Sequence, residues 1–295
     1  MNLKRIRSPG LLQNNDMSRY EDFKNKALAG YMDHDRFIRV RDMVLERMER
    51  RRFFDAKGIY GDGGFGVLAE KTLHATLKYY AEPDDNYHEV AMYGFFADIC
   101  KDGRITEIQT KQFGNLRKKL GVFLEEHEVT VIYPVAVNKW RGYTEDGSKR
   151  PESFRLSGHH MNEYSAFEEL YRIKEYLPHT GLRVHLYMMD MEEILVKQKK
   201  IKGRRRSRSG YERYDDIPLG IRKIVELNEV NDYMQFIPEM TETETPEEGF
   251  TSADFAAGAG IGRSTASLVL NILDHVGVVR REGKRGNYYL YKTAY

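Results

Sequence analysis

The segment around Asp102-Gly103 restricts the fold of this chain more than any other. An Asp-Gly pair is typical of a two-residue type I′ turn, because both of its residues adopt positive φ angles at low cost. Residues rich in aromatic and β-branched side chains flank it, over 88–100 and over 105–110. The sequence therefore predicts an antiparallel hairpin in which residues 101–104 make the tight turn.

Three polar residues are expected to meet on this hairpin. Side chains of a strand alternate between its two faces, so Glu107 and Gln109 point the same way. Pairing across the hairpin brings Asp98 beside them. Two carboxylates and an amide oxygen suit Mg²⁺, which prefers oxygen ligands and keeps several waters for substrate phosphates. The backbone carbonyl of Ile108 is a further candidate ligand.

Charged residues near this site have supporting roles in the same hypothesis. A helix is expected over residues 67–80, and Glu70 on it could approach the metal from one side. His74 follows one turn later on the same helix face and could line the cleft. Lys111 lies two residues beyond Gln109 and could stabilise negative charge that develops on a phosphodiester.

Hydrophobic periodicity indicates an α+β chain. Helical spacing predicts further helices over residues 20–54, 113–123, 165–176 and 218–236. An apolar run over 129–137 predicts a strand that is covered on both faces of a sheet, and a second such strand is expected over 183–190. Residues 139–156 are polar and are expected to form a loop.

The order of these features resembles the PD-(D/E)xK nuclease superfamily over about residues 65–140. That resemblance implies a restriction-endonuclease-like mixed sheet flanked by helices, and DNA cleavage with Mg²⁺ or Mn²⁺. It also implies that Asp98 and Glu107 are metal ligands and that Gln109 stands where the superfamily usually has lysine. Glutamine carries no positive charge. Some restriction endonucleases of the superfamily use it there, and Lys111 could compensate by reaching back.

The last 46 residues resemble a winged helix-turn-helix domain. Its recognition helix is expected over 263–275, and Arg263, Ser264 and Thr265 at the start of this helix could contact phosphates and base edges. Two strands, over 278–281 and 288–292, would form the wing, with Lys284 and Arg285 at its tip. The alternative is a winged helix that contacts protein. The glycines over 258–262 fit a turn, because their spacing and position do not match a dinucleotide-binding motif.

Basic residues elsewhere are expected to strengthen phosphate binding in a salt-dependent way. Residues 197–213 hold nine Lys or Arg and one Glu, and include Arg204, Arg205 and Arg206. A second basic group, Arg117 and Lys118, lies on the helix after the hairpin. The plain alternative for residues 197–213 is a solvated linker.

Four segments follow from these patterns. They are an N-terminal helical extension (1–55), a nuclease-like domain (56–196), a basic linker with a helical connector (197–249) and the winged helix (250–295).

Cys100 is the only cysteine, so no disulfide can form within the chain. A signal peptide and an apolar run of about 18 residues are both lacking, which predicts a cytoplasmic protein without a membrane partner.

The leading functional hypothesis is a Mg²⁺-dependent endonuclease that acts on duplex DNA. The main alternative is a DNA-binding regulator or adaptor whose nuclease-like core is inactive. A third alternative is an interaction protein with no nucleic-acid role. The sequence does not decide between DNA and RNA as the substrate. It also leaves a homodimer possible, because cutting both strands of a duplex requires two cleavage events.

Overall fold

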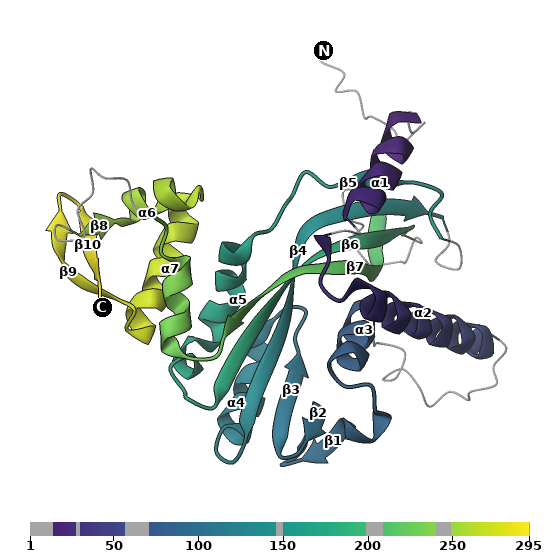
Figure 1. Ribbon diagram of the computed structural model, residues 1–295, viewed down its shortest axis with the longest axis horizontal. Helices are drawn as coiled ribbons and strands as arrows, with labels where there is room; N and C mark the ends of the chain where they lie inside the picture. Colours follow the sequence, from purple (N-terminus) through teal and green to yellow (C-terminus); the bar gives the residue numbers. More distant parts are fainter. Residues whose placement is uncertain are drawn as a thin grey trace. The chain divides into compact units, whose positions relative to one another are not determined.

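A computed structural model of the chain describes residues 14–27, 30–56, 71–145, 150–198, 209–239 and 249–294 (Figure 1). Glu70, the glycine-rich segment 58–66 and the three consecutive arginines 204–206 lie outside these described residues. The chain forms two compact units. The first comprises Met1–Leu73, Asn138–His160 and Asp190–Arg222, and the second comprises His74–Val137, Met161–Met189 and Lys223–Tyr295.

Seven strands of the described residues form one sheet, in the order β1-β2-β3-β4-β6-β7, with β5 paired to β4. The sheet is mixed, because β3 pairs with β4 in parallel whereas β1 with β2, β2 with β3, and β4 with β5 pair antiparallel. The expected mixed sheet of an α+β chain is thus confirmed. The strands are β1 His88–Met92, β2 Phe95–Lys101, β3 Arg104–Ile108, β4 Glu128–Thr144, β5 Phe154–Leu156, β6 Leu182–Lys197 and β7 Tyr211–Leu227.

Two tight turns bound β2. Asp102 and Gly103 have φ angles of 50° and 74°, and Lys101 pairs with Arg104, so the expected hairpin is confirmed. Tyr93 and Gly94 form a second turn of the same kind, with φ angles of 50° and 80°. The single strand expected over 88–100 is therefore wrong, because this turn divides it into β1 and β2.

The core of the second unit lies between the sheet and a group of helices. Its helical elements are the 3₁₀ turn Phe113–Leu116, α4 Arg117–Phe123, α5 Phe167–Leu170 and the 3₁₀ turns on either side of α5. Leu120, Phe123 and Phe167 are fully buried and pack with Val131 and Val135 of β4. α3 (Thr72–Ala81) lies on the other side of these strands (Figure 1). Helices on both sides of β3 and β4 explain why β4 is apolar on both faces.

The C-terminal elements belong to the same unit and share its hydrophobic core. They are α6 Ser252–Ala259, α7 Arg263–Val276 and a three-stranded sheet of β8 Phe250–Thr251, β10 Tyr288–Thr293 and β9 Val279–Arg285, in that order. A capping box joins Thr251 and Asp254 at the start of α6. Gly260 and Gly277 end α6 and α7 with positive φ angles, and Phe255 is fully buried beside Tyr164.

Polar strands and buried ion pairs characterise the first unit. β4 continues through Lys139 and Arg141, whose side chains contact Glu193 of β6 at 3.3 and 2.6 Å. These pairs neutralise the buried Glu193, which explains why residues 139–144 form a strand. The polar loop expected over 139–156 is therefore wrong at both of its ends, because residues 139–144 belong to β4 and residues 154–156 form β5.

Helix boundaries also differ from expectation. The single helix expected over 20–54 is two helices, α1 Asn14–Ala27 and α2 His34–Ala56. The helix expected over 218–236 is wrong, because β7 occupies residues up to Leu227 and only the 3₁₀ segment Val230–Phe236 is helical. None of the helices that the structure describes has the length and apolar character needed to cross a membrane.

Candidate functional site

The site begins where the β2–β3 ladder ends. The last pair toward the open end of the hairpin is Ile99 with Thr106. Beyond it, the Asp98 carboxylate accepts a hydrogen bond from the Ile108 amide, with 2.7 Å between N and Oδ2. The Asp98 carboxylate thus accepts the hydrogen bond that a main-chain carbonyl would accept in a regular ladder. This hydrogen bond holds the carboxylate between the two strands.

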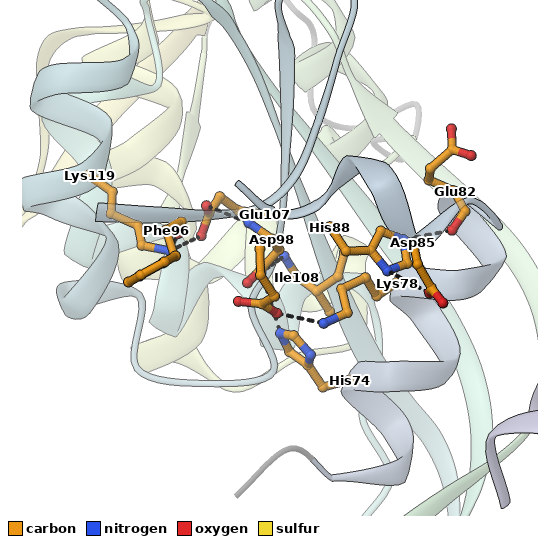
Figure 2. A network of polar contacts seen from close by, with 11 residues as sticks. His74, Lys78, Glu82, Asp85, His88, Phe96, Asp98, Glu107, Ile108 and Lys119 are labelled. Carbon is orange, nitrogen blue, oxygen red and sulfur yellow. Dashed lines mark hydrogen bonds and ion pairs between the residues drawn. The ribbon is translucent and has the colours of Figure 1, made fainter. Parts of the chain in front are cut away.

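Glu107 lies beside Asp98 and is 2% exposed. Its Oε1 accepts the Asp98 amide at 3.4 Å, and its Oε2 lies 2.8 Å from Nζ of Lys119 on α4. The same ammonium donates to the Phe96 carbonyl at 2.7 Å. Figure 2 shows this contact chain from Lys119 through Glu107 to Asp98.

His74 completes the group from the opposite side. It comes from α3, and its Nε2 lies 3.4 Å from Oδ2 of Asp98 (Figure 2). Four elements that are separate in sequence, α3, β2, β3 and α4, therefore supply one cluster of charged side chains. All of them belong to the second unit.

The two carboxylates have opposite pKa shifts. Burial, followed by the charge of Asp98, raises the pKa of Glu107 to about 7, although Lys119 opposes this. Burial alone would raise the pKa of Asp98 as well, but His74 and the Ile108 amide bring it below its usual value. At neutral pH, Asp98 is ionised and Glu107 is near its midpoint, so the two neighbouring carboxyl groups differ in their protonation.

The structure brings two of the expected catalytic residues together and places the others differently. Gln109 donates through Nε2 to the carbonyls of Lys111 and Gln112, so its amide binds the turn after β3. The Lys111 side chain is exposed. Ile108 contacts the pair through its amide N–H, whereas its carbonyl was the expected ligand. Glu70 lies outside the described residues.

The described residues that the sequence predicts to contact nucleic acid lie on α4, α7 and the β9–β10 hairpin. Arg117 is exposed and forms an ion pair with Glu175 at 2.5 Å, and Lys118 is exposed. Arg263 and Ser264 are exposed at the start of α7, whereas Thr265 is half-buried.

The side chains of the two expected wing residues also make contacts within the C-terminal elements. Lys284 lies 5.2 Å from the centre of the Tyr289 ring. Arg285 lies 3.5 Å from Asp254 and donates to the Gly249 carbonyl.

Lys119 is the residue of this charged cluster that the sequence analysis did not single out. Its basic neighbours point to phosphate contacts, but no local pattern links a residue of α4 to Glu107, twelve positions earlier. His74 was expected only to line a cleft. The usable signal for His74 was its helical spacing from Glu70, which gave the face of the helix but not the Asp98 contact.

Asp98 and Glu107 are the two side chains of the cluster that could supply part of the ligand set of a hard divalent cation. Among the described residues, no group of three or more His, Cys, Asp or Glu side chains is arranged to hold a metal ion. Mg²⁺ often uses only one or two carboxylates, with waters and substrate phosphates as its other ligands. Asp98 and Glu107 provide two such carboxylates, and their mutual repulsion would be relieved by a bound cation.

The fold and this site define an α+β chain with a carboxylate pair at the end of a hairpin on a mixed sheet. Residues 71–228, just over half of the chain, match the family described as Domain of unknown function (DUF8091). The chain belongs to that family, whose match runs from α3 to the end of β7. An uncharacterized protein from Treponema pallidum (strain Nichols) is 30% identical over 228 residues, covering 76% of this chain and 85% of that protein. No solved structure matches the chain.

Proposed function

We propose that this protein hydrolyses DNA phosphodiester bonds in a Mg²⁺- or Mn²⁺-dependent reaction at Asp98 and Glu107. The observation that carries the proposal is the buried pair itself. Glu107 is almost fully withdrawn from water, and the charge of Asp98 helps to raise its pKa to about 7. Buried carboxylates with a strongly perturbed pKa and a specific charged neighbour are typical of functional sites.

Each residue has a distinct role in the proposal. Asp98 and Glu107 would hold the metal, which supplies an activated water and stabilises charge on the phosphate when bound. His74 positions Asp98 and favours its ionised form. Lys119 would provide the positive charge that the PD-(D/E)xK superfamily usually places at the position of Gln109. Two of its three N–H groups are used by Phe96 and Glu107, and the third is left for a phosphate oxygen.

The C-terminal elements would supply duplex affinity as a winged helix. The order of α6, a Gly-rich turn, α7 and the β9–β10 hairpin supports this interpretation. Arg263 and Ser264 stand at the exposed start of α7, and Lys284 lies on the hairpin. In this proposal these side chains contact phosphates and fix the register of the protein on DNA, as positioning contacts do in general.

The test is nicking of supercoiled plasmid by purified protein with Mg²⁺ or Mn²⁺. We expect nicking by the wild type, loss of nicking on adding EDTA, and loss in Asp98→Asn and in Glu107→Gln. The matched control is Glu82→Gln, because Glu82 is also a buried carboxylate that pairs with a lysine, Lys101 at 2.6 Å. Nicking that persists in the Asp98→Asn/Glu107→Gln double variant would contradict the site assignment.

A second candidate is a DNA-binding regulator with an inactive core. It is favoured by one observation, namely that Gln109 carries no charge and binds the carbonyls of its own turn. Absence of nicking together with a salt-sensitive shift of duplex DNA would support this alternative. Absence of both would leave an interaction protein without a nucleic-acid role.

A further inference from the structure

Phe96 is the most exposed large hydrophobic side chain in the part of the chain that the structure describes. It is 61% exposed, although it lies within β2. Its cross-strand partner is Ala91, whose side chain is too small to cover an aromatic ring. The neighbouring Phe95, in contrast, packs edge-on against Phe123 with 6.1 Å between ring centres. Phe96 therefore contributes little to the core, and its exposure needs another explanation.

The position of Phe96 ties it to the candidate site. Its carbonyl accepts a hydrogen bond from Lys119 Nζ at 2.7 Å, and the same ammonium lies 2.8 Å from Glu107 Oε2. Asp98 follows two residues later on the same strand. Figure 2 shows Phe96 and Lys119 together at one end of the contact chain that leads to Asp98. Because side chains two positions apart share a face of a strand, the exposed Phe96 ring lies on the same face of β2 as the Asp98 carboxylate, at the edge of the candidate site.

This combination matches the chemistry of a nucleotide in a single strand. The ammonium and a bound cation would attract a phosphate, while an aromatic ring offers a stacking surface for a base. Within a duplex, neighbouring base pairs cover both faces of every base, so stacking on a protein side chain requires a nucleotide that has left the stack. The exposed cation Lys118 on α4 adds attraction for the phosphate backbone.

We infer that the strand entering the site is unpaired and that one of its bases stacks on Phe96. The inference rests on the proposed function, and it specifies the substrate class as DNA with a single-stranded segment. Phe96 is then a specificity-determining residue that favours single strands and flaps over uninterrupted duplex. A winged helix that binds duplex is compatible with this, because a flapped DNA contains both kinds of segment.

The test measures stacking without cleavage. An oligonucleotide containing 2-aminopurine, single-stranded or annealed to its complement, is titrated with protein in Ca²⁺, and fluorescence reports both binding and stacking. The variants are Phe96→Ala, Phe96→Trp and the control Tyr171→Ala. Tyr171 is a matched control because it is 46% exposed and has the Lys174 ammonium 5.3 Å from its ring centre.

We expect Phe96→Ala to bind the single strand about tenfold more weakly and to lose the fluorescence quenching, because one base–aromatic stack is lost. Phe96→Trp should retain both properties, and Tyr171→Ala should match the wild type. Binding of duplex should not change in any variant. Equal binding of single strand by wild type and Phe96→Ala would overturn the inference, as would a loss that is the same for duplex and single strand.

Two further outcomes separate this inference from its alternatives. If Phe96→Ala instead abolishes a dimer in sedimentation experiments while leaving oligonucleotide binding intact, Phe96 is an interface residue and the inference is wrong. If nicking is absent in Mg²⁺ but the Phe96-dependent binding persists in Ca²⁺, hydrolysis fails and the single-strand site stands. The failure of one proposal can thus be told from the failure of the other.

Discussion

The Lys119 ammonium lies 2.8 Å from the Glu107 carboxylate, joining a residue of α4 to a strand end twelve positions earlier in the chain. Only 3% of the Glu107 side chain and 23% of the Lys119 side chain are exposed, so little water screens this pair. With Asp98 alongside, two carboxylates share this site with the Lys119 ammonium and with His74, which lies 3.4 Å from Asp98. A divalent cation bound between the two carboxylates would add positive charge, as phosphate binding requires.

The first prediction concerns stability and pH in metal-free buffer. The pKa of Glu107 is raised from 4.5 to about 7, so the folded chain holds a proton there that the unfolded chain has released. This contribution to stability is complete below pH 4.5 and is lost as the pH rises to 7. Glu107→Gln does not titrate, so its unfolding free energy should fall by about 2 kcal/mol less than that of the wild type between pH 5 and pH 8. Urea denaturation at both pH values measures this difference.

The pKa of Asp98 is shifted in the opposite direction, below its usual value, so Asp98 stays ionised throughout that window. Glu82→Gln serves as the control, because the pKa of Glu82 is lowered by its hydrogen bond to Lys101. An equal pH dependence in wild type and Glu107→Gln would show that Glu107 is ionised at pH 5.

The second prediction concerns Lys119 and the pH dependence of nicking. Lys119 lowers the pKa of Glu107 and would stabilise charge on the phosphate. Lys119→Met should therefore reduce the nicking rate about 10²-fold and move the acidic limb of the pH–rate profile to higher pH. Lys119→Arg keeps the charge and should leave the acidic limb nearly in place. A rate loss without any movement of that limb would show that Lys119 does not control the pKa of Glu107 during the reaction.

The third prediction concerns His74 and metal affinity. His74 lies 3.4 Å from Asp98 Oδ2 and favours the ionised carboxylate. Removing such a supporting contact typically weakens metal binding 10- to 100-fold, so His74→Phe should bind Mn²⁺ about tenfold more weakly in a calorimetric titration. His160→Asn is a control, because His160 contacts Asn138 in the first unit. Unchanged Mn²⁺ affinity in His74→Phe would remove His74 from the site.

The fourth prediction concerns the C-terminal elements and salt. If Arg263 and Lys284 contact phosphates, each change to glutamine should lower the salt slope of duplex binding by about one. Arg183→Gln is the control, because Arg183 is engaged with Glu128 through two hydrogen bonds. Filter binding over a range of NaCl concentrations gives the slopes. Slopes that remain equal to that of the wild type would argue against a winged helix that binds DNA through these side chains.

Short sequence patterns predicted the elements whose structure depends on the conformational preferences and polarity of neighbouring residues. Asp102-Gly103 is a strong turn signal, because both residues tolerate positive φ angles, and the hairpin follows from it. Tyr93-Gly94 makes an equivalent turn, but tyrosine rarely adopts positive φ, so this turn carried no such signal. The apolar composition of residues 129–137 was enough to predict a strand covered on both faces.

Long-range pairing explains what the sequence alone did not predict. Lys139 and Arg141 look like loop residues until they contact Glu193, which is more than fifty positions away. β7 includes Ile217 and Ile221, whose spacing also fits a helix, and tertiary pairing with β6 decides in favour of a strand. The candidate site shows the same division. Strand alternation brought Asp98 near Glu107, whereas Lys119 and His74 join them through tertiary packing.

The two tight turns around β2 also limit how this region can change during evolution. Turns at Tyr93-Gly94 and Asp102-Gly103 leave only the seven residues of β2 between them. Inserting or deleting one residue within 95–98 would rotate Asp98 to the opposite face of the strand, or force one of the turns to rearrange. Length variation among related chains is therefore expected in neighbouring loops but not in this strand. In a deletion scan, residues 95–101 should tolerate no change of length, even where single substitutions are accepted.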